Sequence, residues 1–467
     1  MPQATDRRQF LRTSAGGFGG VALAHLLSQD AMGLSRPQFV PRAKRVIQLF
    51  MNGGASPMDT FDPKPRLAEL HGTAFDPGDG QKVESVTKSP GFKVLKSPFE
   101  FKKHGQCGRW VSSVFPHIAG VVDELAFLMS MTSTTNVHGL GSYMQNTGFT
   151  QPGFPCMGAW ISYALGRINQ NLPEFIVMPD PKGLPYNNLG NFSAAFLPAK
   201  HTGTVINAGS DRPINYLFPP KEADHITPQS ETDGLALLDQ LDRSFASRVG
   251  GDSRLEARIE SYQLAARMQL SAPELFELRG ETPATRKLYG LDDAGTADFA
   301  KRCILGRRML ERGVRFVQIW SGPGGPTKNW DNHANIKTEL PYMANQVDKP
   351  IAALINDLKS RGMFEDTLVV WTTEFGRMPF SQGQAGRDHN GGTFVTWLAG
   401  AGIKAGTAHG ESDEWGWKAK TPIWCYDLHA TILHLLGIDH ERLTVRHNGI
   451  DRRLTDVHGE VIRPILA

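Results

Sequence analysis

The sequence has few cysteines, and none of them forms a C-x-x-C pair. The four are scattered along the chain, at Cys107, Cys156, Cys303 and Cys425. Structural zinc sites built from thiolates usually draw on closely spaced cysteine pairs. Zinc-thiolate chemistry is therefore not expected, and the spacing leaves open whether any disulfide forms.

The chain also lacks a sustained block of lysine and arginine, and its formal net charge is only +3. Binding to nucleic acid or to an anionic membrane surface would need such a basic cluster on the protein, so neither kind of binding is expected. The 467 residues are 40% hydrophobic and 21% charged, which is typical of a globular protein with a large core. There is no internal repeat and no low-complexity tract.

A short basic and weakly apolar segment at the start of the chain indicates export. The pair Arg7-Arg8 is followed by Phe10-Leu11 and by an apolar run over residues 15–27. This order is typical of a twin-arginine signal, although an ordinary basic amphipathic N-terminus is the alternative. No stretch is long and apolar enough to span a membrane stably. We expect residues 1–35 to be a signal and linker read by the twin-arginine translocase, which places a soluble protein in the periplasm or cell envelope.

Short apolar runs alternate with helical periodicity, which predicts an α/β fold with a mostly parallel sheet and helices on both faces. The expected strands are 46–51, 125–131, 175–178, 314–320, 367–373 and 393–399. The expected helices are 256–268, 299–312, 348–360 and 427–436, with Asp348 capping the third and Pro350 in its first turn. We expect one α/β domain over residues 36–467, with residues 219–293 as a helical insertion.

Polar side chains stand next to several predicted strands, at the edge where open α/β sheets bind ligands. They are Asn52 and Asp59, Asn136 and His138, Asp331 and His333, Glu374 and Arg377, and Arg387 and His389. Carboxylates, imidazoles and amides at one edge predict a divalent-metal site with oxygen and nitrogen donors. Two arginines would add a clamp for a tetrahedral oxyanion such as phosphate or sulfate. Taken singly, each residue has a structural alternative, as a turn former or a hydrogen-bonded histidine.

Over its whole length the chain resembles the DUF1501 family of exported proteins, which is placed in the alkaline-phosphatase-like and sulfatase-like superfamily. The motifs that carry the resemblance are Met51-Asn52-Gly53-Gly54, Asp59-Thr60-Phe61-Asp62-Pro63-Lys64-Pro65, Glu374-Phe375-Gly376-Arg377 and Gly386-Arg387-Asp388-His389. The resemblance implies an alkaline-phosphatase-like fold more firmly than it implies a reaction.

The resemblance also implies roles for individual residues. The expected metal ligands are Asn52, Asp59, Asp331, His333, Glu374 and His389, around zinc, calcium or manganese. Cys156 stands in the place of the superfamily's nucleophile, before a helix that starts near Met157. A helix N-terminus there would favour both a thiolate and a bound oxyanion.

Two departures from the superfamily pattern limit what can be carried over. Phe375 stands where phosphoglycerate mutases and sulfatases have the histidine of Asp-His-Gly, and it cannot bind metal. The sulfatase maturation motif C-x-P-x-R is absent, because the chain reads Cys156-Met157-Gly158-Ala159-Trp160. We therefore expect neither a complete two-zinc centre nor conversion of Cys156 to formylglycine.

The leading interpretation is an exported, metal-dependent hydrolase of sulfate or phosphate esters, either small molecules or polysaccharides. Cys156, Arg377 and Arg387 are the predicted catalytic residues, with water as the alternative nucleophile to the Cys156 thiol. The rival interpretation is a catalytically degenerate protein that binds a ligand or an envelope protein partner.

Overall fold

The computed structural model describes residues 37–467 apart from 79, 84–91, 170, 210–226, 250–258, 260–272 and 384. The predicted export signal and nearly all of the predicted helix 256–268 lie outside the described residues. Among those described, no helix is both long and apolar enough to cross a membrane.

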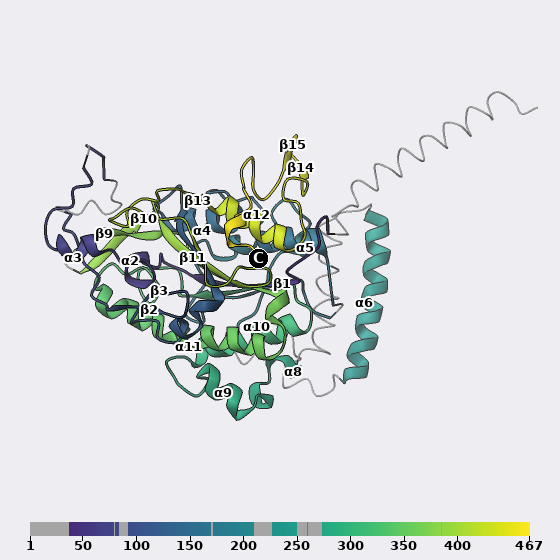
Figure 1. Cartoon of the computed structure of the whole chain (residues 1–467). Coiled ribbons are helices and arrows are strands. Elements are labelled where there is room, and N and C mark those ends of the chain that lie inside the picture. The colour runs from purple at the N-terminus through teal and green to yellow at the C-terminus, as the bar shows by residue number, and fades with distance from the viewer. Residues whose placement is uncertain are drawn as a thin grey trace, which may run out of the picture.

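A nine-stranded sheet forms the centre of the protein, in the order β12-β4-β11-β8-β1-β7-β5-β6, with β13 also paired to β4 (Figure 1). The strands are β1 (Arg45–Met51), β4 (Leu125–Thr132), β5 (Phe175–Met178), β6 (Thr204–Val205), β7 (Phe316–Ser321), β8 (Thr367–Thr372), β11 (Phe394–Gly400), β12 (Ala408–His409) and β13 (Ile423–Trp424). Only β11 runs antiparallel to its neighbours, which are β4 and β8. The predicted mostly parallel α/β fold is confirmed, and each of the six predicted strands is present.

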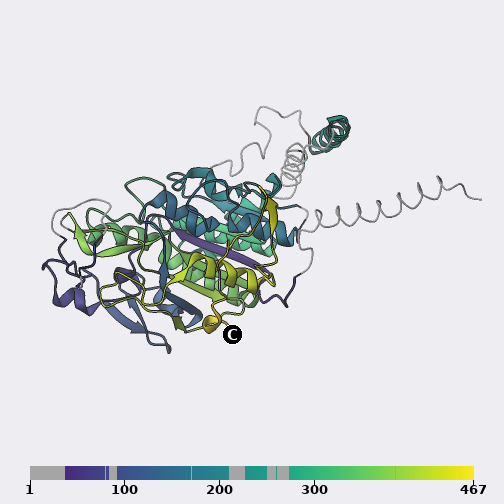
Figure 2. The ribbon, with the colours of Figure 1, turned by 90° about the horizontal axis from the view of Figure 1, so that it is seen from above.

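Helices cover both faces of the sheet, as the views in Figures 1 and 2 agree. One face carries α10 (Ala297–Glu311) and α11 (Ile336–Ser360), and the other carries α4 (His138–Thr147), α5 (Met157–Leu165) and α12 (Cys425–Leu435). Side chains of β1 alternate between the two faces. Ile47 and Leu49 join the core with α10 and α11, whereas Val46 and Phe50 join the core with α5 and α12. Burial on both faces explains why this strand is a nearly continuous apolar run.

The helix predicted to begin at Asp348 is longer than expected. α11 begins at Ile336, where the side chain of Asn335 accepts a backbone N–H at 3.1 Å as the N-cap. Asp348 lies in the middle of the helix, and its carboxylate accepts the backbone N–H of His117 at 2.9 Å. Pro350 also lies inside the helix. The predicted start was wrong because the capping carboxylate serves a turn far away in the sequence.

The remaining elements include the long helix α6 (Pro228–Val249) and several short helices and strands. The helices are α2 (Pro57–Thr60), α3 (Pro65–Glu69), α6 (Pro228–Val249), α8 (Pro273–Phe276) and α9 (Pro283–Tyr289), with 3-10 helices η1 (Ile118–Glu124), η2 (Asn188–Phe192), η3 (Ala199–His201), η4 (Leu278–Gly280), η5 (Phe364–Asp366) and η6 (Arg463–Ile465). The strands are β2 (Phe101–His104), β3 (Arg109–Ser112), β9 (Gly376–Gln382), β10 (Gly386–Asn390), β14 (Val445–His447) and β15 (Ile450–Arg452).

One edge of the sheet gathers most of the polar residues predicted from the sequence. The parallel strands β1, β4, β7 and β8 all end at this edge. Because β11 runs the other way, the segment that precedes it arrives at the same edge. That segment is the antiparallel ribbon of β9 and β10, which lies between β8 and β11 in the chain. The topology therefore brings distant parts of the sequence to one place.

Candidate metal centre

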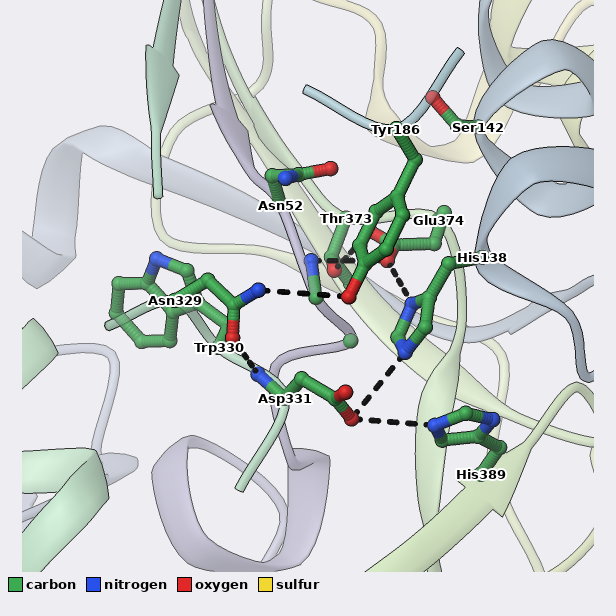
Figure 3. Close-up of polar contacts among 12 residues, drawn as sticks. Asn52, His138, Ser142, Tyr186, Asn329, Trp330, Asp331, Thr373, Glu374 and His389 are labelled. Atoms are coloured by element: carbon green, nitrogen blue, oxygen red, sulfur yellow. Dashed lines mark hydrogen bonds and ion pairs between the residues drawn. The ribbon is translucent and has the colours of Figure 1, made fainter. Parts of the chain in front are cut away.

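Four side chains converge beyond this edge: His138, Asp331, His333 and His389, whose ligand atoms all lie within 4.8 Å of one another. Oδ1 of Asp331 is 3.2 Å from Nε2 of His138, 2.6 Å from Nε2 of His333 and 3.1 Å from Nε2 of His389. Figure 3 shows His138 and His389 pointing at this carboxylate from different sides. The side chains are buried except for His333, which is partly exposed.

The four members of the cluster come from three separate segments at the sheet edge. His138 is the first residue of α4, which follows β4. Asp331 and His333 lie in the loop between β7 and α11, and His389 lies in β10. The cluster therefore requires the sheet, the loop and the ribbon to be in place together.

The other nitrogen of each ring, Nδ1, faces an oxygen that has no proton to give. These acceptors are Glu374 Oε1 for His138 at 2.6 Å, the backbone oxygen of Asn136 for His389 at 2.8 Å, and Gln382 Oε1 for His333. Each Nδ1 is thus the N–H donor, which leaves a lone pair on Nε2 of the neutral ring. Orientation of a histidine by a carboxylate or carbonyl behind it is a regular feature of metal ligands.

Three Nε2 lone pairs around one carboxylate oxygen repel one another unless protons or a metal cation lie between them. Nε2 of His333 and Nε2 of His389 are only 2.7 Å apart, and Nε2 of His138 is buried 3.2 Å from Oδ1 of Asp331. A divalent cation at the centre satisfies all of these atoms at once. Three imidazoles and one carboxylate fit zinc or another transition metal better than calcium, which prefers oxygen ligands.

The members of the cluster differ in ionisation, and a bound cation would have to displace the proton that His138 favours. Burial lowers the pKa of His389 to about 4, which keeps this ring neutral and its lone pair available. Burial also disfavours the charged form of Asp331, but Arg377 and the three imidazoles outweigh it and hold the pKa of this carboxyl well below its usual range. Burial opposes charge on His138 too, yet hydrogen bonds to Asp331 and Glu374 raise its pKa. The centre is therefore an anionic environment that attracts a cation.

Aromatic rings fix the orientation of His138. Its ring stacks on Tyr186 with 4.5 Å between centroids and an angle of 4° between planes. The ring of Phe375 lies 4.8 Å away from His138, tilted by 31°. The phenylalanine that departs from the superfamily pattern thus packs against a histidine of the cluster. The Tyr186 hydroxyl donates to the backbone oxygen of Gly325 at 2.8 Å, which holds the stack in place.

The other predicted ligands lie outside the cluster. Glu374 contacts the Nδ1 side of His138 and also accepts the backbone N–H of Gly53 at 2.8 Å. Asn52 donates from Nδ2 to two carbonyls of the loop after β7, and its Oδ1 is buried without a partner. Asp59 is fully buried in an ion pair with Arg387 at 2.5 Å. The structure thus brings three of the six predicted ligands into one cluster, with Glu374 directly behind it.

The two predicted oxyanion-clamp arginines are fully buried, and each nitrogen of both guanidinium groups has a protein partner. Arg377 donates to Asp331 Oδ1 at 2.6 Å and to several backbone carbonyls, including that of Gly54 at 2.8 Å. Arg387 donates to both carboxylate oxygens of Asp59, at 2.5 and 3.2 Å, and to a backbone carbonyl. These contacts leave neither guanidinium group open to an ester.

Cys156 lies in the hydrophobic core, at the N-cap of α5, and is 2% exposed. The helix begins at Met157, as predicted. Burial raises the pKa of this thiol to about 12, although backbone N–H groups of the helix start act in the opposite direction. The expected thiolate is therefore absent at neutral pH, because desolvation outweighs the helix N-terminus.

A cavity of about 330 Å³ is lined in part by Asp331, one of the four residues of the cluster. It is lined by Pro326, Thr327, Lys328, Asn329, Asp331, Asn332, Thr338, Glu339 and Tyr342. Most of these residues belong to the loop after β7 and to the start of α11, the two segments on either side of the carboxylate.

The fold and the site together define an α/β protein with a candidate metal centre at the carboxyl edge of its sheet. The chain belongs to the DUF1501 family: the family described as "Protein of unknown function (DUF1501)" matches residues 43–466. The predicted membership is thus confirmed. No curated protein matches the chain.

Several solved structures show a distant likeness. The phosphonate monoester hydrolase SpPMH from Silicibacter pomeroyi is 13% identical, with a TM-score of 0.35, over 75% of this chain and 71% of that one. The alkaline phosphatase from the Antarctic bacterium TAB5 is 11% identical, with a TM-score of 0.34, over 85% of this chain and 98% of that one. The lipoteichoic acid synthase LtaP from Listeria monocytogenes is 11% identical, with a TM-score of 0.33, over 85% of this chain and 72% of that one. At these values the likenesses carry no argument about the chemistry of this chain.

Proposed function

We propose that the chain is an exported, alkaline-phosphatase-like hydrolase that uses a divalent metal ion to cleave phosphate or sulfate esters. One observation carries the proposal: three oriented Nε2 atoms and Oδ1 of Asp331 converge on one point beside a cavity. The oxygen acceptors behind all three rings orient these atoms as histidine ligands are oriented in metal sites.

Four residues would hold the metal ion, and two others orient these ligands. His138, His333, His389 and Asp331 would hold the ion, and a bound divalent ion supplies Lewis-acid polarisation of an ester oxygen. Glu374 orients His138 through Nδ1, while Arg377 keeps Asp331 ionised and in position. Water is the proposed nucleophile, because the Cys156 thiol is buried in the core and protonated.

Metal removal and return tests this function. The purified protein should contain about one divalent ion per chain by mass spectrometry of the metals. It should hydrolyse an aryl phosphate or an aryl sulfate, lose that activity in a chelator and regain it when the ion is restored. A protein with no bound ion and no hydrolysis on either ester would instead support the rival role as an envelope binding protein.

A variant of the cysteine distinguishes the two nucleophiles. Cys156→Ala should retain kcat within about twofold, because no reacting atom reaches a thiol in the core. Cys156→Ser serves as the matched variant that keeps a possible nucleophile. Loss of activity in the alanine variant alone, with both variants folded by circular dichroism, would identify the thiol as the attacking group.

We also propose export by the twin-arginine route, on the strength of the segment around Arg7-Arg8. Replacing both arginines by lysine should leave the protein in the cytoplasm, because an ammonium group does not reproduce the planar fork of a guanidinium group. Cell fractionation and immunoblotting would measure this, with Arg12→Lys as the control. Normal export of the double variant would contradict the assignment.

A further inference from the structure

A second pocket, of about 620 Å³, lies next to the metal centre. Asn136 connects the pocket to the metal centre: it lines the pocket, and its backbone oxygen accepts the Nδ1 proton of His389 at 2.8 Å. Because Nδ1 and Nε2 point to different sides of the ring, the pocket lies across His389 from the converging lone pairs. Its described lining consists of Lys82, Ser133, Thr134, Thr135, Asn136, Val137, Met378, Asn390, Gly391, Gly392, Trp417 and Lys418.

The described lining carries two positive charges and no negative one. Nζ of Lys418 donates to Gln81 Oε1 at 2.7 Å and lies 4.1 Å from the ring of Trp417. Both of these partners are neutral, and among the described residues no carboxylate forms an ion pair with Lys418 or Lys82. Two exposed ammonium groups over a hollow surface attract an anion.

Hydroxyl groups in the pocket are also arranged as donors. Oγ of Ser133 accepts the backbone N–H of Thr135 at 3.4 Å, and Oγ1 of Thr135 accepts the backbone N–H of Val137 at 3.1 Å. Each hydroxyl keeps its proton, which can donate to an anion in the pocket. Val137 is also the N-cap of α4, so the positive end of that helix lies at the same wall.

We propose that this pocket binds a second oxyanion group of a substrate that carries at least two, a multiply sulfated or phosphorylated carbohydrate. The inference rests on the proposed function and names the substrate class of the same site. One ester group would lie at the metal centre, and another would lie across His389 between the lysines and the hydroxyls. A small monoester has a single anionic group and cannot occupy both places.

The test compares wild-type protein with the double variant Lys82→Gln/Lys418→Gln by titration calorimetry in a chelator, so that no ion contributes. Dextran sulfate is the sulfated probe, inorganic tripolyphosphate the phosphate probe and plain dextran the uncharged probe. We expect the double variant to bind one or both anionic probes at least about tenfold more weakly, since two charge-assisted contacts are lost. Plain dextran should not bind.

The control is Lys404→Gln, an exposed lysine that lines neither pocket. It should bind the anionic probes as wild-type protein does. Equal affinity of wild-type protein and the double variant for both anionic probes would overturn the proposal, and so would an equal loss in the Lys404→Gln control.

Hydrolysis of a 4-nitrophenyl ester separates this inference from the proposed function. Lys404→Gln, which lines neither pocket, should cleave this small monoester at the wild-type rate. One possible outcome is that wild-type protein hydrolyses no ester, while the double variant binds dextran sulfate more weakly than wild-type protein does. That outcome would support the anion-binding pocket and contradict the proposed hydrolase function. If wild-type protein shows metal-dependent hydrolysis and the double variant binds both anionic probes with wild-type affinity, the proposed function stands and the anion-binding pocket is contradicted.

Discussion

His389→Ala should remove the bound metal ion and lower kcat/KM for an aryl ester by roughly two orders of magnitude or more. The variant removes one of the three converging Nε2 atoms, and we expect the fold to persist, since outside the cluster the His389 side chain contacts the backbone oxygen of Asn136 and the ring of Phe375. Asp331 is a poorer choice, because its loss would also leave the buried Arg377 without its carboxylate. Metal content and zinc affinity are the direct measurements.

Glu374→Gln provides a graded comparison. If Glu374 only orients His138, the variant should weaken metal affinity by about 10–100-fold, which is the usual effect of removing a group behind a ligand. If Glu374 is itself a ligand, its loss should match that of His389→Ala. His458→Ala, an exposed histidine far along the chain, is the control and should change neither metal content nor rate. Full metal content in His389→Ala would contradict the cluster.

Arg387→Met should lower the free energy of unfolding by about 3–5 kcal/mol, the usual cost of breaking a buried ion pair by removing one partner. Arg387 and Asp59 are both 0% exposed, and the remaining carboxylate would stay buried without its counter-charge. Urea unfolding followed by circular dichroism measures the loss. The exposed pair of Lys420 and Glu411 offers a control, since Lys420→Met should leave stability nearly unchanged.

The double variant Asp59→Leu/Arg387→Met separates the structural role from the predicted oxyanion clamp. With both charges removed, the protein should recover much of the stability lost in Arg387→Met, because no unpaired charge remains in the core. Wild-type stability together with a large loss of ester hydrolysis in Arg387→Met would show instead that this arginine serves the reaction.

The sequence predicted the central strands well, because buried β-branched runs such as Thr367–Thr372 have few alternatives. It failed at the start of α11. There Asp348 followed by Pro350 has the form of a helix start, but the carboxylate caps the backbone at His117, more than 200 residues away. Local patterns cannot distinguish a cap for the following turn from a cap for a distant one.

The sequence predicted only part of the site, because local patterns place a residue at a strand end but do not report its distant contacts. Positions next to strand ends identified Asp331, His333 and His389, because topology alone brings them to one edge. His138 also followed a predicted strand, but nothing local showed that its Nε2 would point at Asp331. The pairing of Arg387 with Asp59 joins residues 328 apart in sequence, and no spacing rule reports such a contact.

The central strand β1 has consequences for how the chain folds during synthesis. Val46 pairs with Phe316 on one side and with Leu368 on the other, so both neighbours of β1 are made long after β1 itself. At ordinary rates of translation the strand waits on the order of tens of seconds for them. During that time an apolar segment with both edges unpaired emerges from the ribosome, which is the kind of segment that aggregates. We therefore expect a chaperone to bind the nascent chain until β7 and β8 have been made.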